Sequence, residues 1–289
     1  MTTVVQRCAE RCGQPMFLCD FSPPRGADLS TVDQVKQVGA DFVCVAYSPG
    51  KSVRVDSTVM AHLIGRDGEQ QVVFNLACRD MNRLAIQNHL LGAQLLGLEN
   101  VLVLQGDEFT ERDLKSLKSV ADYRPVELIG DIGLLNEGVD FRGLKLRQPT
   151  TFCVGAVVDL TRADMEREVG LARQKVSAGA DYLITQAFYD LDQPARFHDL
   201  YAKLAGQELT VPVFYGLQIL EAEGLMFGDV PQKVRRDLDR GRSGVDIALE
   251  QLRAYIDGGM TGVYLVPPIL RGGRRDYRAA GSVLDAFRD

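Results

Sequence analysis

Short apolar runs recur along the chain at the spacing of a parallel α/β protein. Runs of roughly four to eight apolar residues without alternation are typical of strands that are covered on both faces. Eight such runs predict strands at residues 16–21, 41–47, 71–78, 101–106, 151–158, 181–187, 211–217 and 261–266. The segments between them predict helices.

The segment 163–178 carries the clearest helical pattern, with apolar residues at spacings of four, three and four. Thr161 and Asp164 predict a capping box at its start. Gly179 predicts a left-handed residue just past its end. Glycines precede several other predicted strands in the same way, which indicates a repeated strand–loop–helix unit.

Eight such units predict a single α/β domain over residues 1–289, folded as a (β/α)8 TIM barrel. An open, doubly wound sheet is the rival. We favour the barrel because no G-x-G-x-x-G turn follows an early strand. An insertion is expected at about 108–150, between strands four and five, with a short helical pattern at 113–120 and a glycine-rich stretch at 130–143.

Composition and charge limit the classes of function that the chain can have. With 46% hydrophobic residues and a net charge of −6, the chain has a full core and no general attraction to nucleic acid or an anionic membrane. No apolar run is long enough to span a bilayer, and residues 1–13 lack a signal-peptide core. A cytoplasmic location is therefore expected. The six cysteines and three histidines show no metal-ligand spacing, so no metal site is predicted.

Polar residues stand at the ends of three predicted strands. Asp20, Asp107 and Gln186 each lie at or just past the end of an apolar run. In α/β barrels the chemistry lies at the C-terminal ends of the strands, so these side chains predict one shared polar site. A carboxylate there can act as a general acid or accept N–H donors from a heteroaromatic ring. Turn or capping aspartates and a core glutamine are the structural alternatives.

Other candidates flank the predicted site. Lys51 and Arg54 follow the second strand and could bind a phosphate or a carboxylate-rich tail. The basic run at 233–242 could do the same, although such runs are usually solvated helix faces.

Together these residues resemble the methylenetetrahydrofolate reductase family from Phe17 to about Leu284. The resemblance lies in the motifs DFSPPR (20–25), LQGD (104–107), KVSAGAD (175–181) and ITQAFYD (184–190). The motif GVYLVPP (262–268) is most similar to the reductase-like domain that is fused to homocysteine methyltransferase domains in some bacteria.

The resemblance implies a folate-dependent one-carbon enzyme that reduces 5,10-methylenetetrahydrofolate to 5-methyltetrahydrofolate with FAD and NADH or another electron donor. It implies Asp20 as the catalytic acid. By the same resemblance, substrate-binding positions fall on Asp107, Gln186, Phe188 and Gln218, and cofactor-binding positions on Tyr47, Ser48, Asn75, Gln105 and Lys175.

The departures from the family pattern fall mainly on the flavin contacts. Aspartate replaces the usual glutamate at position 20, which shortens the acid by one methylene. Asn75 stands where many members have histidine, and Gln105 where many have arginine. Three more flavin contacts are replaced, by Val157, Leu171 and Gln174. The folate positions are thus kept better than the flavin positions.

The main alternative is a flavin-free tetrahydrofolate methyltransferase that exchanges a methyl group with a corrinoid protein. A weaker alternative is a non-catalytic or electron-relay subunit of a larger complex. The partners left open are an electron-donor subunit, a corrinoid protein and a second copy of the chain.

Overall fold

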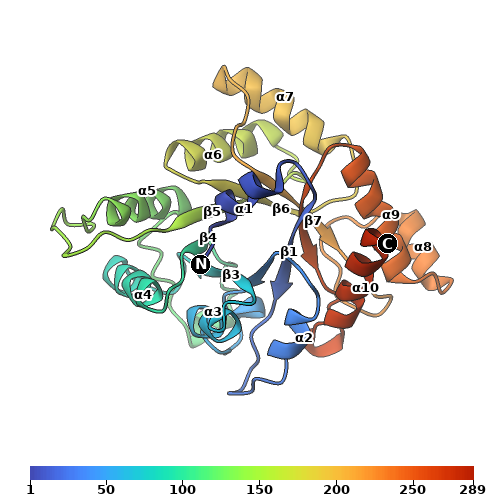
Figure 1. The fold of residues 1–289 in the computed structure, drawn as a ribbon, viewed down its shortest axis with the longest axis horizontal. Helices are drawn as coiled ribbons and strands as arrows, with labels where there is room; N and C mark the ends of the chain where they lie inside the picture. The colour runs from blue at the N-terminus through green and yellow to red at the C-terminus, as the bar shows by residue number, and fades with distance from the viewer.

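A computed structural model describes residues 1–289 as a closed barrel of eight parallel strands in sequence order (Figure 1). Each strand pairs with its sequence neighbours, and β8 closes the barrel on β1. The strands are β1 (Met16–Phe21), β2 (Phe42–Val45), β3 (Gln71–Ala77), β4 (Asn100–Leu104), β5 (Cys153–Val158), β6 (Tyr182–Ala187), β7 (Val213–Gln218) and β8 (Gly262–Val266). The predicted (β/α)8 barrel is confirmed, and the strand bounds differ from the predicted ones by at most two residues.

Ten α-helices accompany the strands, and all but α1, which lies over one end of the barrel, form a ring outside them (Figure 1). They are α1 (Val4–Arg11), α2 (Val32–Lys36), α3 (Ser57–Gly65), α4 (Arg83–Leu95), α5 (Pro125–Asn136), α6 (Met165–Ser177), α7 (Gln193–Ala205), α8 (Gln232–Asp239), α9 (Gly244–Asp257) and α10 (Tyr277–Arg288). Three short 3-10 helices are η1 (Pro49–Lys51), η2 (Asp113–Lys115) and η3 (Arg271–Gly273). No helix is both long and apolar enough to cross a bilayer.

Two apolar layers hold the barrel together. A layer of 52 buried residues lies mainly between the strands and the helices. A smaller cluster of 11, which includes Leu18, Phe42 and Ile184, fills the barrel interior. Because neighbouring residues of a strand point to opposite faces, each strand contributes to both layers. Burying one such Leu, Ile or Phe side chain stabilises the fold by roughly 1.5–3 kcal/mol.

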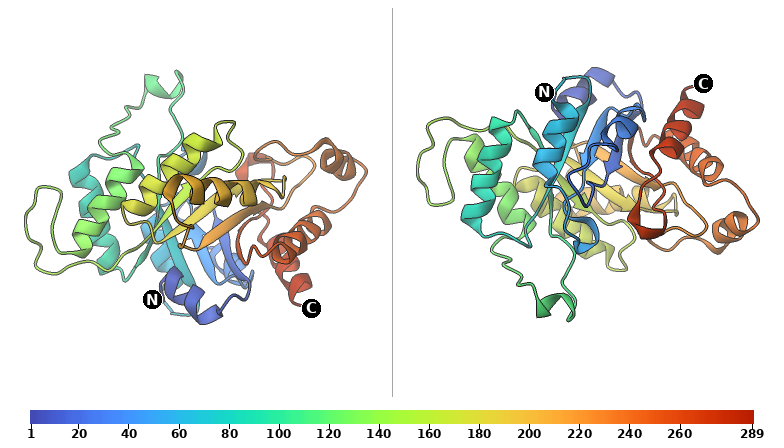
Figure 2. Two further views of the ribbon diagram at one scale, coloured as in Figure 1. Left: turned by 90° about the horizontal axis from the view of Figure 1, so that it is seen from above. Right: turned by 90° about the horizontal axis from the view of Figure 1, so that it is seen from below.

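Helix α1 closes the N-terminal end of the barrel. Val4 is fully buried against the interior cluster, and its backbone N–H donates to Oδ1 of Asn100 at the start of β4 over 2.9 Å. Figure 2 shows α1 at one end of the barrel and the segment around η2 at the other. We call the η2 end, where the strands finish, the mouth. A ligand that approaches the barrel interior must enter through it.

The segment 108–150 contains a helix that the sequence pattern did not predict. Helix α5 includes Gly130 and Gly133, which belong to the stretch that we described as glycine-rich. Each glycine costs roughly 1 kcal/mol relative to alanine in a helix, but four buried apolar residues of α5 outweigh this cost. The short helix expected at 113–120 is only the single turn of η2.

The predicted capping box at the start of α6 is wrong. Asp164 is itself the N-cap and accepts a hydrogen bond from the backbone N–H of Arg167. The hydroxyl of Thr161 donates instead to Asp159 over 2.7 Å. A box would require the helix to begin three residues earlier than it does. The left-handed conformation predicted at Gly179 is present, with φ of 110°.

Candidate functional site

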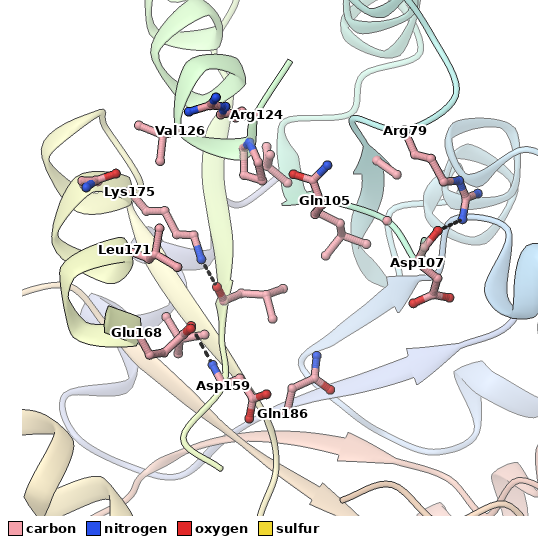
Figure 3. Close-up of a pocket in the computed structure, with 18 of the residues that line it drawn as sticks. Arg79, Gln105, Asp107, Arg124, Val126, Asp159, Glu168, Leu171, Lys175 and Gln186 are labelled. Carbon is pink, nitrogen blue, oxygen red and sulfur yellow. Dashed lines mark hydrogen bonds between the residues drawn. The ribbon is translucent and has the colours of Figure 1, made fainter. Parts of the chain in front are cut away.

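A cavity of about 740 Å³ opens at the mouth beside the ends of β3 to β6 (Figure 3). The first turn of α5 and one face of α6 complete its wall. Five of the substrate- and cofactor-binding positions predicted from the sequence line it, namely Tyr47, Gln105, Asp107, Lys175 and Gln186. Residues 139 positions apart in the sequence therefore share one site.

Asp107 is held at the rim by its backbone. Arg79 donates from Nη1 to the backbone oxygen of Asp107 over 2.9 Å, which leaves the Asp107 carboxylate exposed (Figure 3). Gly106 makes this crossing possible: it has φ of 85°, and a Cβ there would lie 3.0 Å from the Cβ of Arg79. Arg79 is fixed in turn by a bidentate pair with Asp80, at 2.6 and 2.8 Å. The carboxylate is thus presented to a ligand on a rigid support.

Arg79 is a site residue that the sequence interpretation missed. Its side chain is only 8% exposed and its guanidinium lies 4.6 Å from the centre of the Phe109 ring. The available signal was an arginine two residues after the apolar strand β3, because charged residues are rarely buried unless they are paired.

Gln186 reaches the cavity through a bulge in β6. The pairing of β6 with β7 shifts register between Ile184 and Ala187, so that β6 contains one extra residue. Gly216 faces this bulge: a Cβ there would lie 2.6 Å from the backbone of Gln186. The Gly216 N–H donates to the Thr185 hydroxyl over 2.8 Å, which pins the bulge. Bulges commonly redirect a side chain near a site, and here the exposed side chain is Gln186.

Lys175 extends from α6 toward the end of β5. Its Nζ donates to the backbone oxygen of Val157 over 2.6 Å (Figure 3). Burial lowers the pKa of Lys175, and nearby Glu168 partly opposes that shift. The ammonium group forms no ion pair with a carboxylate, so it is available to an anion.

Glu168 and Arg162 are further cavity residues that the sequence interpretation missed. Glu168 is 3% exposed, accepts from the backbone N–H of Asp159 over 3.0 Å, and pairs with Nε of Arg162 over 3.2 Å. The positive charge of Arg162 is therefore neutralised by Glu168. Arg124 lines the opposite side of the cavity at the start of α5 and forms no ion pair. The positions of Glu168, Arg162 and Arg124 in the cavity follow from packing between elements. No distinctive local motif in the sequence marks these residues.

Asp20 does not line the 740 Å³ cavity. It continues the inner face of β1 above Leu18 and is 5% exposed. Oδ1 accepts the Tyr264 hydroxyl over 2.9 Å, and Oδ2 accepts from Nε of Arg275 over 3.0 Å. Both carboxylate oxygens are thus occupied by donors from β8 and the loop after it.

Gln218 and Phe188 are both engaged inside the protein. The Gln218 side chain donates to the backbone oxygen of Leu225 over 2.8 Å and accepts from the N–H of Phe227 over 2.7 Å. It therefore fastens the loop after β7. Phe188 is 1% exposed and stacks on Tyr255 with 5.0 Å between ring centres. A substrate would reach either side chain only after these contacts opened.

The remaining expected cofactor positions lie around the ends of β2 and β3. Asn75 is 5% exposed, and its Oδ1 is buried without a hydrogen-bond partner. Tyr47 lines the cavity, and burial raises its pKa, with Asp80 adding to the shift. Ser48, with φ of 40°, precedes η1 and does not line the cavity. The unpaired oxygen of Asn75 is the kind of group that a bound ligand commonly satisfies.

The cations of the loop after β2, Lys51 and Arg54, already bind other groups of the protein. Lys51 pairs with Asp113 over 2.7 Å and donates to the backbone oxygen of Glu108 over 3.0 Å. It therefore fastens the segment around η2 to η1. Arg54 donates to backbone oxygens, including that of Pro23 over 2.7 Å. The basic run at 233–242 lies on and just after α8, where most of its cations are exposed.

The closed barrel and its polar mouth define a (β/α)8-barrel protein with a ligand-binding site at the C-terminal ends of its strands. The family model described as "Methylenetetrahydrofolate reductase" matches residues 5–266. The chain belongs to this family.

The chain is similar to "Methylenetetrahydrofolate reductase 1" of Schizosaccharomyces pombe, with 24% identity over 84% of this chain and 42% of that protein. It is also similar to "5,10-methylenetetrahydrofolate reductase" of Pectobacterium carotovorum, with 25% identity over 67% of this chain and 61% of that protein. The chain thus spans less than half the length of the yeast relative.

One solved structure matches 99% of both chains with a TM-score of 0.66 and 13% identity. Its title reads "Uncharacterized protein from Clostridium thermocellum binds two copies of 5-methyl-5,6,7,8-tetrahydrofolic acid". At this identity the match supports the fold.

Proposed function

We propose that this chain reduces 5,10-methylenetetrahydrofolate to 5-methyltetrahydrofolate, with hydride from a reduced flavin. The observation that carries the proposal is the convergence of Asp107, Gln186 and Lys175 on one cavity of a chain that belongs to the reductase family. The folate-binding C. thermocellum protein, which shares the fold, supports a folate as the substrate class.

The cavity residues fit a flavin in two respects. Val126, Val157 and Leu171 provide an apolar wall against which a planar ring can pack. Lys175 and Arg124 are cations without carboxylate partners, as the phosphates of FAD require. When bound, the flavin would supply the hydride. NADH or another electron donor would restore it.

Asp107 and Gln186 would orient the folate. The exposed Asp107 carboxylate can accept two N–H donors from the pterin edge, and the Gln186 amide can both donate and accept. Their supports, Arg79 and the β6 bulge, limit their motion. Holding reactants in a fixed geometry is one of the largest contributions an enzyme makes to rate.

Asp20 would handle the proton at the folate nitrogen. Because Tyr264 and Arg275 occupy both of its oxygens, the carboxylate must give up one of these donors when it contacts substrate. The Tyr264 hydrogen bond is the cheaper one to exchange, since Tyr264 is an uncharged donor whereas Arg275 forms a buried ion pair with the carboxylate. Arg275 would then keep Asp20 in place at the mouth.

A second function is favoured by the side chains around the flavin position. Gln105, Gln174, Leu171 and Val157 all line the cavity, and none of them carries a charge. Such a wall also suits a protein that binds folate without flavin. That protein would exchange a methyl group between tetrahydrofolate and a corrinoid protein, with Asp20 handling the same proton.

The first experiment is the visible spectrum of the purified chain after incubation with excess FAD and desalting. A retained flavin band, together with reduction of methylenetetrahydrofolate by the reduced protein, is the expected result. A colourless protein that binds tetrahydrofolate and transfers a methyl group from methylcobalamin without flavin would overturn the reductase in favour of the methyltransferase.

A pair of variants tests the site itself. Gln186→Leu should weaken folate binding by about tenfold or more, because the pterin would lose its amide partner. Gln207→Leu changes the same residue type at an exposed position outside the cavity and should leave folate affinity unchanged. Equal affinities in both variants would remove Gln186 from the site.

A further inference from the structure

A second cavity of about 650 Å³ lies between the loop after β1 and the loop after β8. It shares no residue with the 740 Å³ cavity. Four arginines line it, namely Arg54, Arg274, Arg275 and Arg278. In a chain with a net charge of −6, this is a local concentration of positive charge.

The two acidic residues of this cavity do not neutralise its arginines. Asp28 accepts from the backbone N–H and the hydroxyl of Ser30, at 2.9 and 2.7 Å. Asp276 caps α10 and accepts from two backbone N–H groups. Neither carboxylate forms an ion pair with Arg54, Arg274 or Arg278. Three guanidinium groups therefore face the cavity without a counter-charge.

Arg54 and Thr31 in the cavity wall both lack a suitable partner. Arg54 donates only to neutral oxygens, and its pKa is lowered by burial and by the neighbouring charges of Arg275 and Arg25. The Thr31 hydroxyl is buried with no hydrogen-bond partner and also lines the cavity. A bound anion would relieve the repulsion between the arginines and accept from the hydroxyl.

The position in the fold favours phosphate among the anions. Phosphate sites in (β/α)8 barrels frequently use the loop after the eighth strand, which forms one wall of this cavity. The loop after β8 includes Gly272 and Gly273, both with φ of 82°. The absence of side chains there lets an anion approach the backbone closely. Arginine forks also match the geometry of phosphate oxygens.

We propose that this cavity binds a phosphate group, either as inorganic phosphate or on a small metabolite, and that Arg275 connects it to Asp20. Arg275 lines the cavity and also donates to the Asp20 carboxylate, with Nε and Nη2 each 3.0 Å from Oδ2. The bound phosphate and Asp20 therefore share one guanidinium. Such sharing couples the two sites reciprocally.

The binding site is tested by titrating the full chain with inorganic phosphate and, separately, with glycerol 3-phosphate, by calorimetry at constant ionic strength. We expect saturable binding of at least one of them. Arg274→Gln and Arg278→Gln should each weaken it fivefold or more, and both residues are exposed enough for the variants to fold. Tighter binding of glycerol 3-phosphate would identify a metabolite site, and equal or tighter binding of phosphate a site for the free anion.

The matched control is Arg253→Gln, which removes an exposed arginine of α9 outside the cavity and should bind as the natural chain does. The absence of saturable binding, or an equal loss in Arg253→Gln, would overturn the proposal. The link through Arg275 is tested with Asp20→Asn, which removes the competing carboxylate and should tighten phosphate binding severalfold. Unchanged affinity in a folded Asp20→Asn protein would disprove the link. Binding is measured without turnover, so failure here would leave the reductase proposal untouched.

Discussion

Asp20 and Arg275 lie 255 positions apart in the sequence and form an ion pair in which both side chains are only 8% exposed. The pair joins the first strand to the loop after the last strand, at the seam where the barrel closes. Buried pairs of this kind are costly to break because the remaining partner keeps an uncompensated charge. The pair is therefore expected to stabilise the closed barrel.

Removal of Arg275 alone should destabilise the protein strongly. We expect Arg275→Met to lower the free energy of unfolding by about 3–5 kcal/mol, because Asp20 would remain buried and charged. The double variant Arg275→Met with Asp20→Asn should recover a large part of that loss. Urea denaturation of the single and double variants measures both values.

The exposed pair of Arg196 and Asp190 is the control for this comparison. Their side chains are 63% and 47% exposed, so Arg196→Met should cost less than about 1 kcal/mol. A similar cost for Arg275→Met and Arg196→Met would show that the Asp20 pair contributes no more than a surface pair.

Loss of the Gln218 amide should loosen the loop after β7. Gln218→Met keeps the side-chain length but removes both hydrogen bonds to residues 225–227, each worth about 0.5–1.5 kcal/mol. We expect faster amide hydrogen exchange over residues 219–231, measured by mass spectrometry. Gln207→Met should leave exchange in this loop unchanged. Unaltered protection in Gln218→Met would mean that other contacts hold the loop.

Lys175 should make anion binding in the 740 Å³ cavity dependent on pH. Burial lowers the pKa of Lys175, so its ammonium group loses its proton at a lower pH than an ordinary lysine does. FAD affinity should therefore fall as the pH rises through that lowered value. Lys175→Met should bind FAD about tenfold more weakly at pH 7, and the difference should shrink at higher pH. The exposed Lys203→Met is the control, and a difference that is constant with pH would contradict this role.

The buried thiol of Cys153 should lower the stability of the folded protein at alkaline pH. Burial raises the pKa of this thiol from its ordinary value of 9.0 to about 12. The folded chain then holds a proton that the unfolded chain releases, so this contribution to stability is present below pH 9 and is lost between pH 9 and 12. Relative to Cys153→Ala, the natural chain should lose about 1.4 kcal/mol for each pH unit in that window.

Urea denaturation of both proteins at pH 7 and pH 10 measures this difference. Cys12→Ala, at the exposed C-terminal end of α1, controls for the removal of a thiol in general. A stability difference between the natural chain and Cys153→Ala that is the same at both pH values would contradict the prediction.

The apolar runs predicted the barrel because a strand covered on both faces needs continuous apolar sequence, and that requirement is local. The polar residues Asp107 and Gln186 could be assigned to one site for a similar reason, since parallel strands all end at the same mouth. Helix α5 was not predicted because its two glycines weaken the local helical pattern. The packing that stabilises this helix involves other elements.

The contacts of the site depend on pairings that no local pattern encodes. Nothing near Asp20 in the sequence indicates Arg275 or Tyr264, which arrive only when β8 closes on β1. The Gln218 amide likewise finds its partners in a loop whose conformation depends on Ile269, through the hydrogen bond from Leu225. The sequence therefore indicated which side chains are near the mouth, and the structure determines which of them are free.

The backbone contact at Gly216 restricts which substitutions this protein can accept. It touches no ligand position directly, yet any side chain there would collide with the β6 backbone that directs Gln186 into the cavity. In a saturation mutagenesis library selected for activity, position 216 should tolerate as few replacements as a catalytic position. Loss of function there would come from a misdirected neighbour while the chemical groups themselves remained intact.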